Sequence, residues 1–200
     1  MTIVFVLLGA VVLGLSLRIE PGSVWFYPAT FGLAAVWAVG AFASGPLHLG
    51  RIAYRDLHVR PVVTPIVLGL ALAGVFIVGA LVVRQVEPLS DQVSNVLDFA
   101  DQGSLPILVA VTLVNGITEE LFFRGAAYAA IPRHPVLWTT LAYAVATAAT
   151  GNVMLSFAAL LLGLVVGLER RASGGILAPI LTHCAWSLTM LLALPPIFGV

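Results

Sequence analysis

The chain has 200 residues, of which 60% are hydrophobic and 9% are charged. Soluble globular domains carry about 25% charged residues, so this composition excludes that class and predicts a polytopic helical membrane protein. The formal net charge is zero, which gives no reason to expect a nucleic-acid partner, and the single cysteine, Cys184, excludes an internal disulfide.

Apolar segments follow one another along the chain, separated by charged or turn-forming residues. A helix of about 20 apolar residues crosses a bilayer. On this basis we expect spans at residues 2–17, 24–44, 62–83, 104–124, 136–150, 153–168 and 176–194, the last one stopped by Pro195 and Pro196. Between them we expect a loop at 45–61, a polar acidic loop at 84–103 and a glycine-rich turn at 169–175. The expected fold is an all-α transmembrane helical bundle of about seven spans, within a range of roughly six to eight.

The arginines are divided unevenly between the two ends of these spans. At the end of the spans where the acidic loop at 84–103 lies, the only arginines are Arg18 and Arg84. The opposite end would hold Arg51, Arg55, Arg60, Arg124, Arg133, Arg170 and Arg171. The positive-inside rule then places the N-terminus in the cytoplasm and the C-terminus outside. The chain is rich in Ala, Val and Gly, and its basic residues are all Arg, with no lysine. This composition looks GC-rich, so we expect a multi-pass protein of the bacterial plasma membrane.

Two adjacent carboxylates, Glu119 and Glu120, lie near the end of an apolar run. An ionised side chain at the centre of a membrane helix costs roughly 2.5–3.5 kcal/mol, so each needs compensation or a use. Arg124 is four residues after Glu120 and shares its helix face, which predicts an ion pair. Asn115, one turn before Glu119, can donate a hydrogen bond to it. We infer one structural carboxylate and one that is free for chemistry; the alternative is a charge cluster that only anchors the helix end.

His183 is the histidine that falls within an expected span, and Ser187 lies one turn later on the same face. Pro179, one turn earlier, predicts a kink. The alternative for His183 alone is an interhelical hydrogen bond. Taken together with the glutamates, on a span that enters from the same side, we expect His183 to join them in one cleft.

The span at 136–150 carries several hydroxyl side chains, among which Tyr143 and Thr147 share a face. Small hydroxyl groups help membrane helices to pack, and packing is the role expected here. Gly163 and Gly167 have the Gly-x-x-x-Gly spacing of a close helix contact. Cys184 is expected to be a small buried apolar side chain.

The sequence Glu119-Glu120-Leu-Phe-Phe-Arg124-Gly, followed by Gly175-Ile-Leu-Ala-Pro-Ile-Leu-Thr-His183 and Ser187, resembles the CPBP family. These are the CAAX proteases and bacteriocin-processing enzymes, also called Abi. The resemblance divides a single membrane domain into variable N-terminal transmembrane helices at 1–103 and a CPBP-like catalytic helical core at 104–194.

The family pattern has three motifs: Glu-Glu-x-x-x-Arg, Phe-x-x-x-His, and His-x-x-x-Asn or a similar polar residue. The resemblance implies an intramembrane endopeptidase in which Glu119 activates a water, Glu120 and Arg124 form a structural pair, and His183 with Ser187 holds the oxyanion. The second motif is Tyr143-x-x-x-Thr147 here, so its histidine is missing. Thr147 can orient a water but cannot take its proton near neutral pH.

Members of this family are often labelled metalloproteases. The candidate metal ligands in this chain are Glu119 and His183, because Glu120 is expected to pair with Arg124. Catalytic zinc usually has three protein ligands, so a tight zinc site is not expected and no other cofactor is indicated.

Three functions remain open on the sequence. The first is a membrane endopeptidase near the cytoplasmic face, acting on a prenylated CAAX protein, a bacteriocin leader, or an anti-sigma or immunity partner. The second is a catalytically impaired relative that acts as a membrane binding or immunity-type protein. The third is a proton-coupled transporter that uses Glu119 and His183 as a relay. All three have the lipid bilayer as a partner, and the first two also a peptide or protein.

Overall fold

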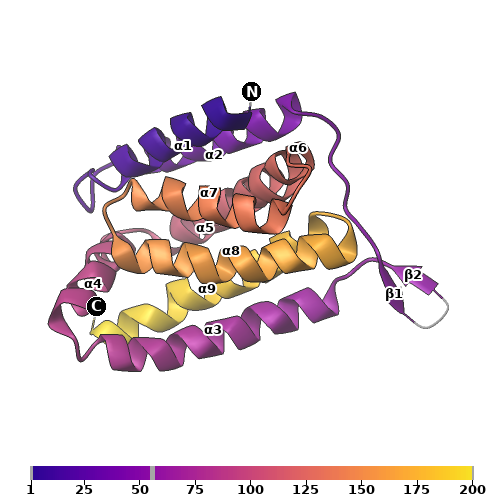
Figure 1. The fold of residues 1–200 in the computed structure, drawn as a ribbon. Coiled ribbons are helices and arrows are strands. Elements are labelled where there is room, and N and C mark those ends of the chain that lie inside the picture. The colour runs from indigo at the N-terminus through magenta and orange to yellow at the C-terminus, as the bar shows by residue number, and fades with distance from the viewer. Residues whose placement is uncertain (1, 55–56, 200) are drawn as a thin grey trace.

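The structure, a computed structural model, describes residues 2–54 and 57–199. It is a helical bundle (Figure 1). The elements, in chain order, are α1 (Thr2–Ser16), α2 (Phe26–Ala43), β1 (Ile52–Tyr54), β2 (Leu57–Val59), α3 (Val63–Val83), α4 (Glu87–Asp101), α5 (Leu105–Glu120), η1 (Leu121–Ala127), α6 (Tyr128–Ala130), α7 (Pro135–Ala148), α8 (Val153–Ser173) and α9 (Leu177–Phe198).

The expected all-α membrane bundle is confirmed. Among the described residues, five helical segments are long and apolar enough to cross a membrane: α2, α3, α5 with its continuation to Ala130, α8 and α9. Two shorter apolar helices, α1 and α7, accompany them. Together they account for the seven spans that were expected. Each lies within a few residues of its expected bounds except at the C-terminal ends of the α5 segment, α8 and α9.

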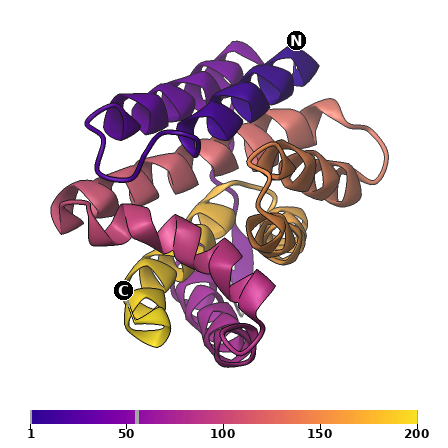
Figure 2. The same cartoon turned by 90° about the vertical axis from the view of Figure 1, so that its left-hand side faces the viewer.

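The helices form layers that place α5 at the centre. A pair formed by α1 and α2 covers one side, and α3 with α9 lies on the opposite side (Figures 1 and 2). Helix α5 contacts both α2 and α9, while α7 and α8 pack against each other beside it. A polar group on the inner faces of α5, α7 and α9 is therefore shielded from lipid.

Contacts at the two ends of the bundle follow the expected division of the arginines. At one end, the Arg51 N–H donates to the Ser173 carbonyl and Arg170 Nε donates to the Arg124 carbonyl. At the other end, Arg84 Nη1 donates to the Ile197 carbonyl. Arg55 lies outside the described residues. The cytoplasmic location of the N-terminus stays a prediction.

Five local expectations were wrong. The region at 84–103 is mostly the amphipathic helix α4, because Pro88 stands in its first turn and apolar residues follow at helical spacing. The loop at 45–61 contains the antiparallel hairpin of β1 and β2. Helix α8 continues through the expected turn as far as Ser173, where Gly174 ends it in a left-handed conformation. Helix α9 continues past Pro195 and Pro196 to Phe198, and Pro179 stands in its first turn, where proline fits without a kink.

Helices α3 and α9 approach closely at Gly69. A Cβ atom there would lie 2.5 Å from the Thr182 carbonyl oxygen and 2.9 Å from the Ala185 Cβ. At Gly74, one and a half turns later on α3, an added Cβ would meet nothing within 4 Å. The glycine at 69 therefore permits the contact that holds the His183-bearing helix in place.

We expect Gly69→Leu to lower the unfolding free energy by about 1–3 kcal/mol relative to Gly74→Leu, because only the first forces the two helices apart. Both substitutions gain the same helix propensity. The difference between the unfolding free energies of the two variants therefore reports the effect on packing alone. Thermal unfolding in detergent micelles measures it. Equal unfolding temperatures for the two variants would contradict the close approach at Gly69.

Candidate active site

The candidate site begins where α5 passes into a wider helical turn. Glu119 and Glu120 are the last residues of α5, and the chain continues as the π-helix η1. In η1, Phe122 and Phe123 are fully buried and pack on the Trp37 ring, with centroid distances of 4.9 and 5.0 Å. These contacts fix the rotation of the segment about its axis. They thereby determine which way the two carboxylates point.

Glu120 and Arg124 form the expected ion pair. Arg124 Nη1 lies 3.2 Å from Glu120 Oε1, and both side chains are completely buried. Arg124 Nη2 donates to the carbonyl oxygen of Gly163 on α8, 3.0 Å away. A Cβ on Gly163 would lie 3.0 Å from that same nitrogen, and one on Gly167 would lie 3.0 Å from Val136 on α7. The two glycines therefore admit the guanidinium and the neighbouring helix, as their spacing indicated.

His183 lies against both carboxylates. Its Nδ1 is 2.9 Å from Glu120 Oε1, and its Nε2 is 4.0 Å from Glu119 Oε2. The ring fits against α5 because Gly116 has no side chain; a Cβ there would lie 3.4 Å from the His183 Cδ2. A carboxylate only accepts hydrogen bonds, so the Nδ1 that faces the Arg124-paired Glu120 carries a hydrogen. The structure thus brings the glutamates of α5 and the histidine of α9 into one buried cluster.

Tyr143 completes this cluster, and the sequence analysis missed it. Its phenol Oη donates to Glu119 Oε2 at 2.7 Å. Asn115 does not serve Glu119 as expected, because its Nδ2 donates instead to the Val111 carbonyl of its own helix. The sequence did contain one indication of this role: Tyr143 lies one turn before Thr147 on the same helix face.

The structure does not bring Thr147 and Ser187 into contact with the cluster. The Thr147 hydroxyl donates to the Tyr143 carbonyl at 2.9 Å, and the Ser187 hydroxyl points back to the Cys184 carbonyl at 3.4 Å. Both use the carbonyl of a preceding helical residue, which is the nearest acceptor for a short hydroxyl side chain. The predicted role of Thr147 in orienting a water, and that of Ser187 in binding the oxyanion, stay predictions.

Comparison with known proteins gives a match to one protein family. Residues 101–189 match the model of the family described as Rce1-like, type II CAAX prenyl endopeptidase. This part of the chain is similar to that family. The matched segment contains the whole Glu119–Glu120–Tyr143–His183 cluster, and the match confirms the resemblance to the CAAX proteases of the CPBP family. No curated protein and no solved structure matches the sequence.

The similarity to the Rce1-like family and the apolar helices together indicate a multi-pass integral membrane protein. Its surroundings are therefore the lipid bilayer. A hydrolytic site inside such a bundle must be closed to lipid and reachable by water, and the layers around α5 meet the first of these conditions.

The donor groups of this site do not fit a zinc ion of the usual kind. Glu120 Oε1 is already shared by Arg124 and His183, and Glu120 Oε2 is buried without a hydrogen-bond partner. Catalytic zinc takes three protein ligands. Across the described ranges, no three His, Cys, Asp or Glu side chains are grouped so that they could hold a metal ion.

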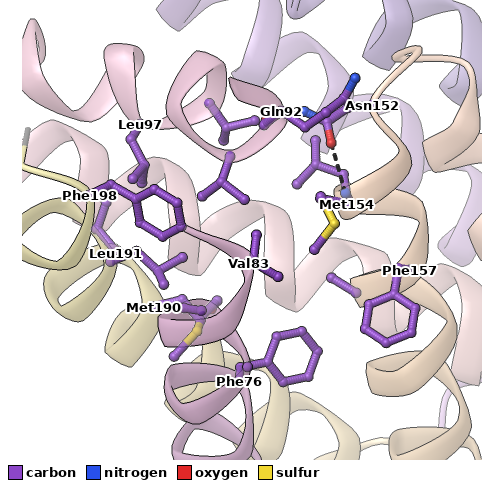
Figure 3. A pocket seen from close by; sticks show the side chains of 18 of the residues that line it. Phe76, Val83, Gln92, Leu97, Asn152, Met154, Phe157, Met190, Leu191 and Phe198 are labelled. Atoms are coloured by element: carbon purple, nitrogen blue, oxygen red, sulfur yellow. Dashed lines mark hydrogen bonds between the residues drawn. The ribbon is translucent and has the colours of Figure 1, made fainter. Parts of the chain in front are cut away.

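An apolar cavity of about 550 Å³ lies next to the cluster, between α3, α4, α8 and α9 (Figure 3). Trp186 connects the two, because its ring lies edge-on to His183 at 6.2 Å and also lines the cavity, as does Ser187. Helix α4 covers one end, where Gln92 is joined to the start of α8 by hydrogen bonds from Asn152 and Val153. The rest of the lining is largely hydrocarbon, including Phe76, Val83, Leu97, Met154, Phe157, Met190, Leu191 and Phe198.

Proposed function

We propose that this chain is an endopeptidase that hydrolyses a peptide bond within the bundle, near the cytoplasmic face of a bacterial plasma membrane. The observation that carries the proposal is the buried cluster in which Glu119 faces His183 Nε2 while Arg124 neutralises Glu120. An uncompensated carboxylate is costly inside a membrane protein. Its retention beside a histidine supports a chemical role.

In the proposed reaction, Glu119 is the general base. It takes a proton from water as the water oxygen bonds to the scissile carbonyl carbon, and the carbonyl π electrons move to the oxygen. Protonated His183 donates through Nε2 to this oxyanion, while Glu120 holds Nδ1. The oxyanion then re-forms the carbonyl, the C–N bond breaks, and Glu119 returns its proton to the leaving nitrogen. Positioned acid–base groups of this kind typically contribute 10²–10⁴-fold.

Thr147 and Ser187 keep their predicted roles as part of this proposal. Thr147 would position the water and Ser187 would donate to the oxyanion beside His183. The Ser187 hydroxyl must turn from its present backbone acceptor to do so. A hydroxyl has one hydrogen to donate and two lone pairs, so Thr147 can accept from a water while its own hydrogen bond is kept.

The apolar cavity supports a substrate with a hydrophobic portion beside the scissile bond. The wall formed by Trp186 and Ser187 is one turn from His183 on α9. A group lodged in the cavity would therefore hold the adjoining peptide near the carboxylates. Holding the reacting groups in place is a large part of catalysis.

A catalytically impaired binding protein is the second candidate, and one observation favours it. The position of the second-motif histidine is Thr147, whose hydroxyl is bonded to its own helix. Such a protein would keep the cavity and lose turnover.

Cleavage in water enriched in ¹⁸O distinguishes the two candidates. The protein in proteoliposomes, given a prenylated CAAX peptide, is expected to release a product with one ¹⁸O atom in its new carboxyl group, because water supplies that oxygen. Mass spectrometry of the product measures it, and the unprenylated peptide is the matched control. Retention of intact peptide by the protein, with no product, would favour the binding protein.

A further inference from the structure

Tyr143 stands where the family's second motif has its aromatic residue, and this chain departs from the family at both ends of that motif. The pattern Phe-x-x-x-His reads Tyr143-x-x-x-Thr147 here. The change at the first position adds a hydroxyl group, and the change at the last removes an imidazole. Both changes lie on one face of α7, one turn apart.

The added hydroxyl reaches the proposed base directly. Tyr143 Oη lies 2.7 Å from Glu119 Oε2, within the range of a strong O–H···O⁻ hydrogen bond. Among the described residues, Glu119 is the hydrogen-bond partner of this phenol. The bond joins α7 to the end of α5, across 24 positions in sequence.

The ring that carries this hydroxyl is held from three sides. The Phe123 centroid lies 5.0 Å away, the guanidinium carbon of Arg124 lies 5.1 Å from the ring centroid, and the His183 centroid lies 6.5 Å away. A side chain fixed in this way loses little further freedom when it makes its hydrogen bond. The phenol therefore acts as a rigid support for the carboxylate.

We propose that Tyr143 is the positioning residue for Glu119, and that its phenol takes in this chain the place of the missing second-motif histidine. This inference rests on the proposed function. The hydrogen bond fixes Glu119 Oε2 and leaves Oε1 to meet a water. Tyrosine does not accept a proton near neutral pH, so the proton taken from water stays on Glu119 until the leaving nitrogen receives it.

Tyr143→Phe removes the hydroxyl and keeps the ring that packs on Phe123 and Arg124. We expect kcat to fall about 10–100-fold, the usual cost of losing such a supporting contact, with KM changed less than about twofold. Tyr128→Phe, on α6, is the matched control, since its ring stacks on Arg170 at 4.7 Å and lies outside the cluster. An unchanged kcat in Y143F, at an unfolding temperature equal to the parent's, would overturn the proposal.

A double-mutant cycle tests the replacement itself. Thr147→His is expected to raise the activity of the Y143F variant at least about tenfold, because the two changes together restore the Phe-x-x-x-His pattern. In the parent chain, where Tyr143 already holds Glu119, the same substitution is expected to gain little. An equal gain in both backgrounds, or no gain in either, would show that the phenol does not stand in for the histidine.

Infrared spectroscopy separates this inference from the proposed function, since it needs no substrate. The Glu119 carboxyl bands, assigned by difference from Glu119→Gln, are expected to shift in Y143F and to stay in place in Y128F. Unshifted bands would refute the positioning role whatever the activity. Shifted bands in a protein that cleaves no peptide would leave Tyr143 as the support of Glu119 and refute only the endopeptidase.

Discussion

Replacing Glu119 with glutamine is expected to lower kcat about 10²–10⁴-fold, the contribution of a positioned general base. The amide is close in size to the carboxylate and can still accept from Tyr143, so the cluster keeps its shape. It cannot take a proton from water. KM is expected to change little, because Glu119 is assigned to the reacting water and not to the apolar portion of the substrate. Steady-state kinetics with a fluorogenic peptide in proteoliposomes measure both constants.

Glu87→Gln is the control for this substitution. Glu87 is the exposed first residue of α4, at the opposite end of the bundle from the arginine-rich end. The Glu87→Gln substitution removes one carboxylate from the chain and leaves the Glu119–Glu120–Tyr143–His183 cluster unchanged. If E119Q retained the activity of E87Q, Glu119 would not be the base and the proposed reaction would be wrong.

Replacing Arg124 with methionine is expected to cost about 3–5 kcal/mol of unfolding free energy, because Glu120 would remain buried without its partner. The guanidinium bridges two elements, Glu120 at the end of α5 and the Gly163 carbonyl on α8, and both bonds would be lost. Arg133→Met, at an exposed position before α7, should change stability by less than about 0.5 kcal/mol. Thermal or chemical unfolding in micelles compares the two variants.

A double variant separates the loss of a contact from the cost of a buried charge. Removing both charges, in E120Q/R124M, is expected to destabilise less than R124M alone, because no unpaired carboxylate is left. A double variant less stable than R124M would show that Glu120 contributes mainly through His183 Nδ1. In that case the ion pair would not be the principal support of the cluster.

The sequence allowed the charged part of the site to be predicted because helix geometry is local. The spacing of Glu120 and Arg124 places them on one face, and the ion pair is present at 3.2 Å. The expectation that His183 would join the glutamates rested on a different ground, namely that polar groups in a membrane bundle avoid lipid. The 2.9 Å contact with Glu120 agrees with that reasoning.

The hydroxyl groups could not be assigned from spacing. Thr147 and Tyr143 share a face, yet only the longer side chain reaches across to α5. A threonine finds its nearest acceptor in its own helix, whereas a phenol extends beyond its backbone. Which of two neighbouring side chains reaches another helix depends on the distance between the helices, which the sequence does not state.

Helix α4 lies where a loop was expected, because the region contains both acidic residues and apolar residues. Glu87, Asp91, Asp98 and Asp101 suggested an acidic loop. Val93, Val96, Leu97 and Ala100 follow the spacing of one helix face, and all of them line the cavity. A test for periodicity would have predicted the helix; the short hairpin of β1 and β2 left no comparable pattern.

Because η1 is a π-helix, the geometry of the site depends on the number of residues in this segment as well as on their identity. Wide turns of this kind represent one extra residue accommodated within an otherwise α-helical segment. Arg124 lies inside that turn and Glu120 immediately precedes it, so the pairing of the two charges depends on how many residues the turn contains. An insertion or deletion there would rotate everything downstream by about 100° per residue. Evolution can therefore exchange side chains along this stretch more freely than it can change the count.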